Sequence, residues 1–152
     1  MTYPSADVQA LIATQFVPVR LALNRAEDRP LFRAYQVIWT PTIVIGDRRG
    51  VAHYQSPGFL PPDQFAAMLR VGLGRALTAW SRFDDATTQL QAVAEDRGSA
   101  WAAEALYWLG VAWYLQARKR APMMRAWQRL RDDYPTSIWA ARVPPNQEDE
   151  EE

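Results

Sequence analysis

The sequence predicts a mixed architecture, in which an α/β half with a sheet of about three strands precedes an all-α half. The α/β prediction rests on short apolar or alternating runs that proline and glycine bound. The all-α prediction rests on apolar residues that recur three and four positions apart from Pro62 onward. An apolar fraction of 49% in 152 residues is sufficient for a packed core.

The first three elements are expected to be a helix, a strand and a second helix. Residues 5–16 place apolar side chains at helical spacing after Ser5, a residue type that often begins helices. Residues 17–23, VPVRLAL, alternate as a strand does, and the proline lies near the first residue, where strands tolerate it. Residues 29–35 form a short amphipathic segment and predict another helix.

A hairpin is expected next. Residues 42–45, TIVI, are apolar throughout, which is typical of a strand buried on both faces. The sequence GDRRG predicts a turn, and Val51–Gln55 predicts the returning strand. Proline is favoured in the first turn of a helix, so the following helix should begin near Pro62.

The remaining sequence predicts helices. Residues 62–80 carry one apolar stripe, and a helix at 101–116 has aromatic side chains on several faces, which indicates a central position. A last short helix is expected to reach Ala141. The residues expected to begin or end these later helices are Asp84, Ser99, Pro122, Pro135 and either Thr136 or Ser137.

The helical half repeats itself. Leu73-Gly74 recurs as Leu109-Gly110, 36 residues later, and Leu90 has its counterpart in Trp127, 37 residues later. This spacing resembles the tetratricopeptide helix-hairpin pattern, in which a small residue lets the two helices of a unit approach closely. The alternative is two ordinary helical hairpins with ordinary core packing.

The pieces YQVIWTPTIVI and GFLPPDQFAAML, with the order of elements around them, resemble the C-terminal two-thirds of the thioredoxin fold over residues 1 to about 78. Several bacterial thioredoxin-like proteins continue into helical hairpins of the type expected here. The resemblance therefore implies a truncated thioredoxin-like domain at 1–78 and tetratricopeptide-like hairpins at 79–142 that share the helix at 62–80. Residues 143–152 are acidic and cannot bury apolar surface, so their composition predicts a disordered tail.

The resemblance also implies a binding loop. It makes Thr40-Pro41 a cis peptide, and in the family the residue before this proline presents its backbone to an extended peptide. Trp39, Thr40 and Pro41 are therefore the candidate peptide- or partner-binding residues. The alternative is that Pro41 only shapes the loop.

Two departures from the family change the functional expectation. The sequence contains no cysteine, so it has no thiol for disulfide exchange, and the family's opening central strand has no counterpart. Open hydrophobic strand edges favour aggregation, and three arrangements would avoid them here. The strands at 17–23 and 42–45 could pair directly, a second copy or a partner could donate a strand, or the protein could begin upstream of Met1 with its cysteines.

Other site chemistry has little support. His53 is the single histidine, so no metal site and no catalytic residue is expected, and no cofactor is indicated. Arg118, Lys119 and Arg120 form the densest basic run, and nucleic-acid binding there is a weak alternative to a solvated helix end. No secretory signal or membrane-length apolar run is present, which predicts a cytoplasmic protein without membrane contact.

These observations predict a non-catalytic protein-binding or scaffold protein. Its expected partners are a protein, a peptide, or a second copy that docks through exposed sheet edges. The alternative function is a thiol–disulfide oxidoreductase of the thioredoxin family whose Cys-x-x-Cys segment is missing from this chain. Whether the protein is an enzyme stays open, and the lack of cysteine favours that it is not.

Overall fold

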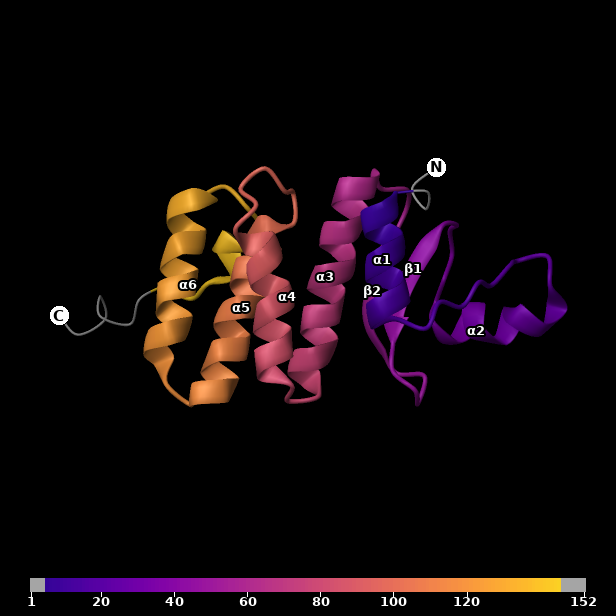
Figure 1. The fold of residues 1–152 in the computed structure, drawn as a ribbon, viewed down its shortest axis with the longest axis horizontal. Helices are drawn as coiled ribbons and strands as arrows, with labels where there is room; N and C mark the ends of the chain where they lie inside the picture. Colours follow the sequence, from indigo (N-terminus) through magenta and orange to yellow (C-terminus); the bar gives the residue numbers. More distant parts are fainter. Residues whose placement is uncertain (1–4, 146–152) are drawn as a thin grey trace.

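The computed structural model describes residues 5–145 of the chain. A small sheet and the N-terminal helix occupy one end of an elongated molecule, and a row of helices extends from them to the other end (Figure 1). The helices are α1 (Ala6–Gln15), α2 (Arg29–Ala34), α3 (Pro62–Ala79), α4 (Phe83–Ala94), α5 (Ala102–Ala117) and α6 (Arg120–Asp133), with short 3₁₀ helices η1 (Ala26–Asp28) and η2 (Ala140–Arg142). The strands are β1 (Thr42–Gly46) and β2 (Ala52–Pro57).

The sheet of the described residues has two antiparallel strands, not about three. The prediction of a strand at 17–23 is wrong: this segment is irregular and largely exposed. The direct pairing of residues 17–23 with 42–45 is wrong for the same reason. An alternating sequence becomes a strand only when a neighbour completes its hydrogen bonds, and within residues 5–145 this segment has no neighbouring strand.

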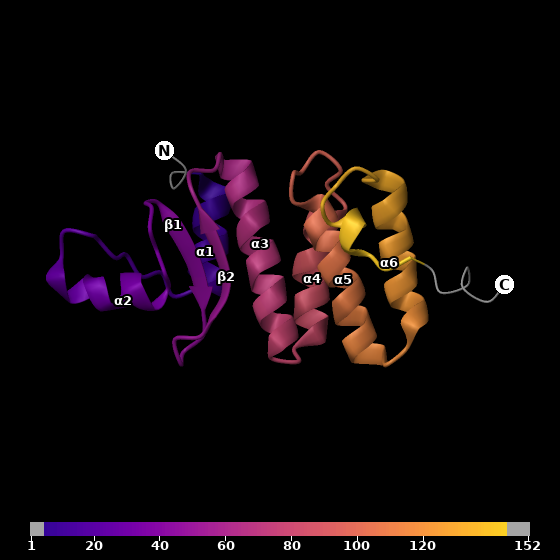
Figure 2. The same ribbon diagram turned by 180° about the vertical axis from the view of Figure 1, so that it is seen from behind.

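The sheet is covered on one face by α3, with α1 beside it; from behind, β2 lies next to α3 (Figure 2). Ile45 is buried on this face, whereas Thr42 and Val44 are only partly buried. The expectation of a strand buried on both faces is therefore wrong for β1. Among the described residues, no helix closes the second face as α3 closes the first.

A glycine in α3 allows the helix to lie close to the sheet. A Cβ at Gly72 would collide with Ile45 and come within 3.0 Å of the Tyr54 ring. The register shift between Ile45 and Gly46 leaves one extra residue on β2, since Ile45 faces Tyr54 and Gly46 faces Ala52. This bulge is at His53 and locally twists the hairpin.

The C-terminal half consists of two helical hairpins, α3–α4 and α5–α6, and a glycine in the first helix of each faces a large side chain in the second. A Cβ at Gly74 would be 2.6 Å from Leu90, and a Cβ at Gly110 would be 2.7 Å from Trp127 Nε1. The predicted central position of α5 is confirmed, because α5 contacts α3, α4 and α6.

Several helix boundaries differ from the expected ones. The residues that precede α4, α5 and α6 are Arg82, Trp101 and Lys119, so Asp84, Ser99 and Pro122 are not helix caps. Ser99 Oγ instead accepts a hydrogen bond from the Trp101 N–H at 3.2 Å in the preceding turn.

The last short helix is the 3₁₀ helix η2, which begins at Ala140. Ser137, three residues earlier, accepts a hydrogen bond from the Ala140 N–H with its Oγ. Val143 is buried next to η2, whereas the acidic residues of the expected tail, from Glu148 on, lie outside the described residues. No helix of the described residues is long and apolar enough to cross a bilayer.

Candidate functional site

The loop between α2 and β1 carries the predicted binding residues. The chain leaves α2 through Gln36, whose φ of 53° reverses its direction, and Val37 N–H returns a hydrogen bond to Phe32 O at 2.8 Å. Tyr35 Oη donates to Gly50 O at 3.1 Å, which ties the end of α2 to the hairpin turn. The Thr40-Pro41 peptide bond is cis, as the family resemblance implies.

The backbone of this loop is only partly hydrogen-bonded. Thr42 Oγ1 donates to Trp39 O at 2.7 Å, and Gly58 N–H donates to Pro41 O at 2.8 Å, which extends the β ladder by one bond. The N–H and C=O of Thr40 make no hydrogen bond to any other residue of 5–145. Of the three predicted positions, Thr40 therefore keeps both backbone groups for a ligand.

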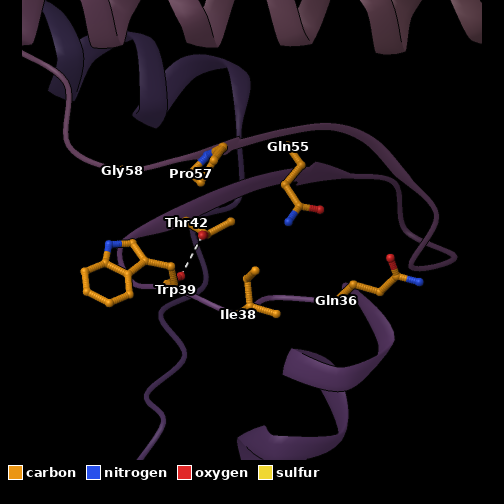
Figure 3. Close-up of a pocket in the computed structure, with 7 residues that line it drawn as sticks. All are labelled: Gln36, Ile38, Trp39, Thr42, Gln55, Pro57 and Gly58. Atoms are coloured by element: carbon orange, nitrogen blue, oxygen red, sulfur yellow. Dashed lines mark hydrogen bonds between the residues drawn. The ribbon is translucent and has the colours of Figure 1, made fainter.

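An open groove of about 460 Å³ runs along this loop on the side of the sheet away from α3 (Figure 3). Gln36 and Trp39 stand at opposite ends of it, with Ile38 between them. Ile38 and Trp39 are 96% and 69% exposed, which is unusual for side chains of this size. The lining residues are Gln36, Ile38, Trp39, Thr42, Gln55, Pro57 and Gly58.

The groove suits binding better than catalysis. None of its lining residues is charged or titrates near neutral pH, so it offers no acid, base or nucleophile. Trp39 lines the groove, whereas Thr40 and Pro41 lie beside it. Sequence reasoning missed Gln55 and Pro57, since only the hairpin register brings the end of β2 opposite the loop. It also missed Ile38, although this residue directly precedes Trp39.

A second polar group, also missed from the sequence, joins the two halves. Tyr54 Oη of β2 donates to Glu104 Oε2 of α5 at 3.3 Å, and Arg75 of α3 lies 3.5 Å from Glu104 Oε1. The Arg75 guanidinium also stacks over the rings of Tyr54 and Trp108, at 5.0 and 4.5 Å from their centroids. These contacts hold β2, α3 and α5 together.

Burial is the main cause of the pKa shifts of Glu104 and Tyr54. Removal from water raises the pKa of Glu104, and the nearby Arg75 charge lowers it by less. Burial, followed by the Glu104 charge, raises the pKa of the Tyr54 hydroxyl. The indole N–H of Trp108 lies close enough to Glu104 to stabilise its charged form, which lowers the pKa of Glu104 slightly. It makes no hydrogen bond of good geometry to any of the described residues.

His53 is part of the hairpin and not of the groove. Its Nε2 lies 3.2 Å from Asp47 Oδ2, and its ring packs edge-to-face against Trp80 with the ring centroids 5.3 Å apart. Hydrogen bonds to the Asp47 carboxylate, chiefly from the Val51 N–H, lower its pKa. Residues 5–145 contain no cluster of three or more His, Cys, Asp or Glu that could hold a metal ion.

The basic run lies at the turn between α5 and α6. Arg118 has a φ of 55° and ends α5, and Lys119 and Arg120 follow it on the surface. Of the nearby arginines, Arg129 pairs with Glu95 at 2.7 Å and with Asp133 at 3.2 Å. Arg131 donates to Pro144 O. Arg129 and Arg131 are therefore held by other groups of this chain.

A comparison with protein families gives a match in the N-terminal part of the chain. Residues 3–72 match the family described as a thioredoxin-like domain. The matched stretch is a little under half of the chain and ends inside α3, so the boundary near residue 78 stays a prediction. Neither a curated protein nor a solved structure gives a significant match.

The matched residues include α1, the segment around α2, the cis-proline loop and the hairpin. The match supports the thioredoxin-like part of the sequence interpretation. It does not extend to α4, α5 and α6, and the tetratricopeptide-like character of the helical hairpins stays a prediction.

Proposed function

We propose that this protein binds an extended segment of another protein in the groove beside the cis-proline loop, without catalysis. The observation that carries the proposal is the pair Ile38 and Trp39, which are 96% and 69% exposed along an uncharged groove. Tryptophan is among the residues that most often dominate binding energy. An exposed tryptophan next to a groove has a clear use only when a ligand covers it.

The free backbone at Thr40 supplies the polar part of the interaction. Its N–H and C=O have no partner within residues 5–145, and an extended peptide can pair with both, as in strand addition. Trp39 O already accepts from Thr42, so Thr40 is the anchor that we assign. Gln36 and Gln55 add neutral hydrogen-bonding groups at the groove walls.

The lining predicts which peptides bind. No charged side chain lines the groove, so a charged residue of the peptide would find no ion-pair partner there. Its removal from water would cost free energy that nothing offsets. Side chains of an extended peptide alternate in direction, so every second residue faces the groove. The expected ligand therefore carries apolar residues at alternate positions and neutral residues elsewhere.

We also infer that α3–α6 form two tetratricopeptide-like units that support this domain. The contact of Gly74 with Leu90 in the first hairpin recurs as the contact of Gly110 with Trp127 in the second. Such units usually stack in series of at least three, so a pair needs support from its neighbours. The Tyr54, Glu104 and Arg75 contacts supply that support between the domain and the hairpins.

The oxidoreductase function has no reactive group in this chain, because none of the 152 residues is a cysteine. Thiol–disulfide exchange requires a thiolate that attacks a disulfide sulfur. A catalysed disulfide reduction by this chain would therefore contradict the binding proposal.

The proposal can be tested with peptides selected from a random decapeptide phage library on the immobilised protein. Labelled copies are then titrated by fluorescence anisotropy against wild type, Trp39→Ala and Ile138→Ala. Ile138 is the matched control, since it is 68% exposed but lies between α6 and η2.

We expect Trp39→Ala to weaken binding at least about tenfold, which corresponds to about 1.4 kcal/mol, because truncation of a buried aromatic anchor is among the costliest changes at an interface. Ile138→Ala should leave the affinity unchanged. The proposal is overturned if the library yields no binder, or if selected peptides bind Trp39→Ala as tightly as wild type.

A further inference from the structure

Residues 17–35, which we call the arm, project from the sheet end of the molecule, away from the row of helices (Figure 1). Val17, Val19 and Leu23 are 91%, 76% and 54% exposed, and α2 contains no buried residue. Contiguous exposed apolar side chains usually mark a surface that another molecule covers. The arm is therefore a candidate surface for contact with another molecule.

The same chain carries an open strand edge. Gly58 N–H donates to Pro41 O, so these two residues form a hydrogen-bonded pair of the ladder. Hydrogen-bonded pairs recur at every second residue, and the next two are Ile43 with Ser56 and Ile45 with Tyr54. Ile43 and Ile45 therefore direct their backbone groups toward β2. Val44 directs its N–H and C=O the other way, and no residue of 5–145 pairs with them. Such an edge is a template for a further strand.

The first part of the arm is suited to this edge. Residues 17–21 make no backbone hydrogen bond within the described chain, and Phe16 just before them is already extended at φ −134° and ψ 157°. Pro18 lacks an N–H, which an outer strand tolerates. The far end is fixed, because the buried Asp28 carboxylate accepts from the Ala22 N–H at 2.7 Å.

We propose that two copies of this chain exchange arms, so that residues 17–21 of each copy add to the β1 edge of the other. Within one copy the unpaired strand and the open edge do not meet. In a two-fold symmetric dimer, the arm of each copy meets the open edge of the other copy. Both edges are then occupied, so the assembly stops at two copies. The exchange is argued from Val44 and the arm, whereas peptide binding is argued from Thr40 and the groove, and the cross-linking test of the exchange uses no peptide.

Cysteine cross-linking tests the exchange directly, because the chain has no native cysteine to interfere. Val44→Cys is mixed with Val17→Cys or with Val19→Cys, oxidised with diamide, and analysed by non-reducing gel electrophoresis and intact mass. We expect a disulfide-linked heterodimer in at least one of these mixtures. Ile138→Cys mixed with Val44→Cys is the matched control and should give only background.

The doubly substituted chain Val19→Cys/Val44→Cys separates exchange from folding back. Exchange predicts covalent dimers from this chain. A monomer with an internal disulfide would show that the arm covers the edge of its own copy, and would overturn the proposal.

Sedimentation velocity supplies the second test. We expect the wild type to be a dimer and Val19→Asp to raise the dimer dissociation constant at least about tenfold, as for loss of a central apolar contact. Ile138→Asp should not change it. A wild type that stays monomeric at its highest attainable concentration would overturn the proposal, as would a dimer that Val19→Asp leaves intact.

Discussion

The contact between Gly110 and Trp127 makes a sharp prediction about the second helical hairpin. An added Cβ at position 110 would lie 2.7 Å from Trp127 Nε1 and 3.3 Å from Met123 O, so Gly110→Ala must displace the indole. Overpacking of this kind costs about 1–3 kcal/mol. Displacement also breaks the hydrogen bond from Trp127 Nε1 to Tyr107 O, now 3.1 Å, at about 1 kcal/mol.

Alanine gains about 1 kcal/mol over glycine in a helix interior, which offsets part of this loss. We therefore expect Gly110→Ala to lower the free energy of unfolding by about 2 kcal/mol, measured by urea denaturation with far-ultraviolet circular dichroism. Gly98→Ala is the control, since its Cβ would meet only Asp96 Oδ1 at 3.4 Å in a turn. Its effect should stay within about 0.5 kcal/mol.

The same contact predicts coupling with its partner. Trp127→Phe should cost less in the Gly110→Ala background than in wild type, because the smaller ring leaves room for the added methyl group. If Gly110→Ala is as stable as wild type or more stable, α5 and α6 do not approach as closely as the structure places them, and the reasoning is refuted.

Three further predictions concern the buried polar group, the hairpin and the chemistry of the chain. Because burial raises the pKa of Glu104, the unfolded chain loses this proton at lower pH than the folded chain. As the pH rises above about 4.5, the ordinary pKa of glutamate, the free energy of unfolding of the wild type should fall relative to that of Glu104→Gln. Urea titrations at a series of pH values measure this, and a stability difference between the two proteins that does not change with pH would contradict it. Asp47→Ala should speed amide exchange at Val51, whose N–H donates to Asp47 Oδ1 at 3.0 Å, and equal exchange in both proteins would show that this bond is unimportant. In an insulin-reduction assay with dithiothreitol, the chain should add nothing to the buffer rate, since it has no cysteine.

Local patterns in the sequence predicted the elements whose structure depends on their own residues. The apolar stripe from Pro62 onward and the turn GDRRG both depend on neighbours within a few positions, and the structure has α3 and the β1–β2 turn there. The repeated glycines at 74 and 110 were placed correctly for the same reason, because helical periodicity fixes the face that a residue presents.

The sequence was misleading where structure depends on distant partners. VPVRLAL alternates as a strand, but alternation cannot supply the neighbouring strand, so the segment becomes an exposed arm. The groove has the same limit. The sequence identifies Trp39 as a binding residue because it lies close to Pro41 in the loop. Gln55 and Pro57 line the groove only because the register of the hairpin places them opposite the loop.

The buried Glu104 shows a third limit. Glutamate in a helix is normally solvated, and nothing nearby in the sequence indicates that Tyr54, 50 positions away, donates to it. A long-range polar contact of this kind leaves no periodic signal. Only the packing of α5 against α3 and β2 brings these side chains together.

The most direct test of the proposed function is a chemical-shift map of the ¹⁵N-labelled protein titrated with a selected, apolar-alternating peptide. Peptide binding beside the cis-proline loop predicts the largest amide shifts from Gln36 to Thr42 and from Gln55 to Gly58, the two segments that form the groove, including the unpaired Thr40 N–H. Largest shifts in α5 or α6, with the loop amides unchanged, would contradict the proposal and place the binding surface on the helical hairpins.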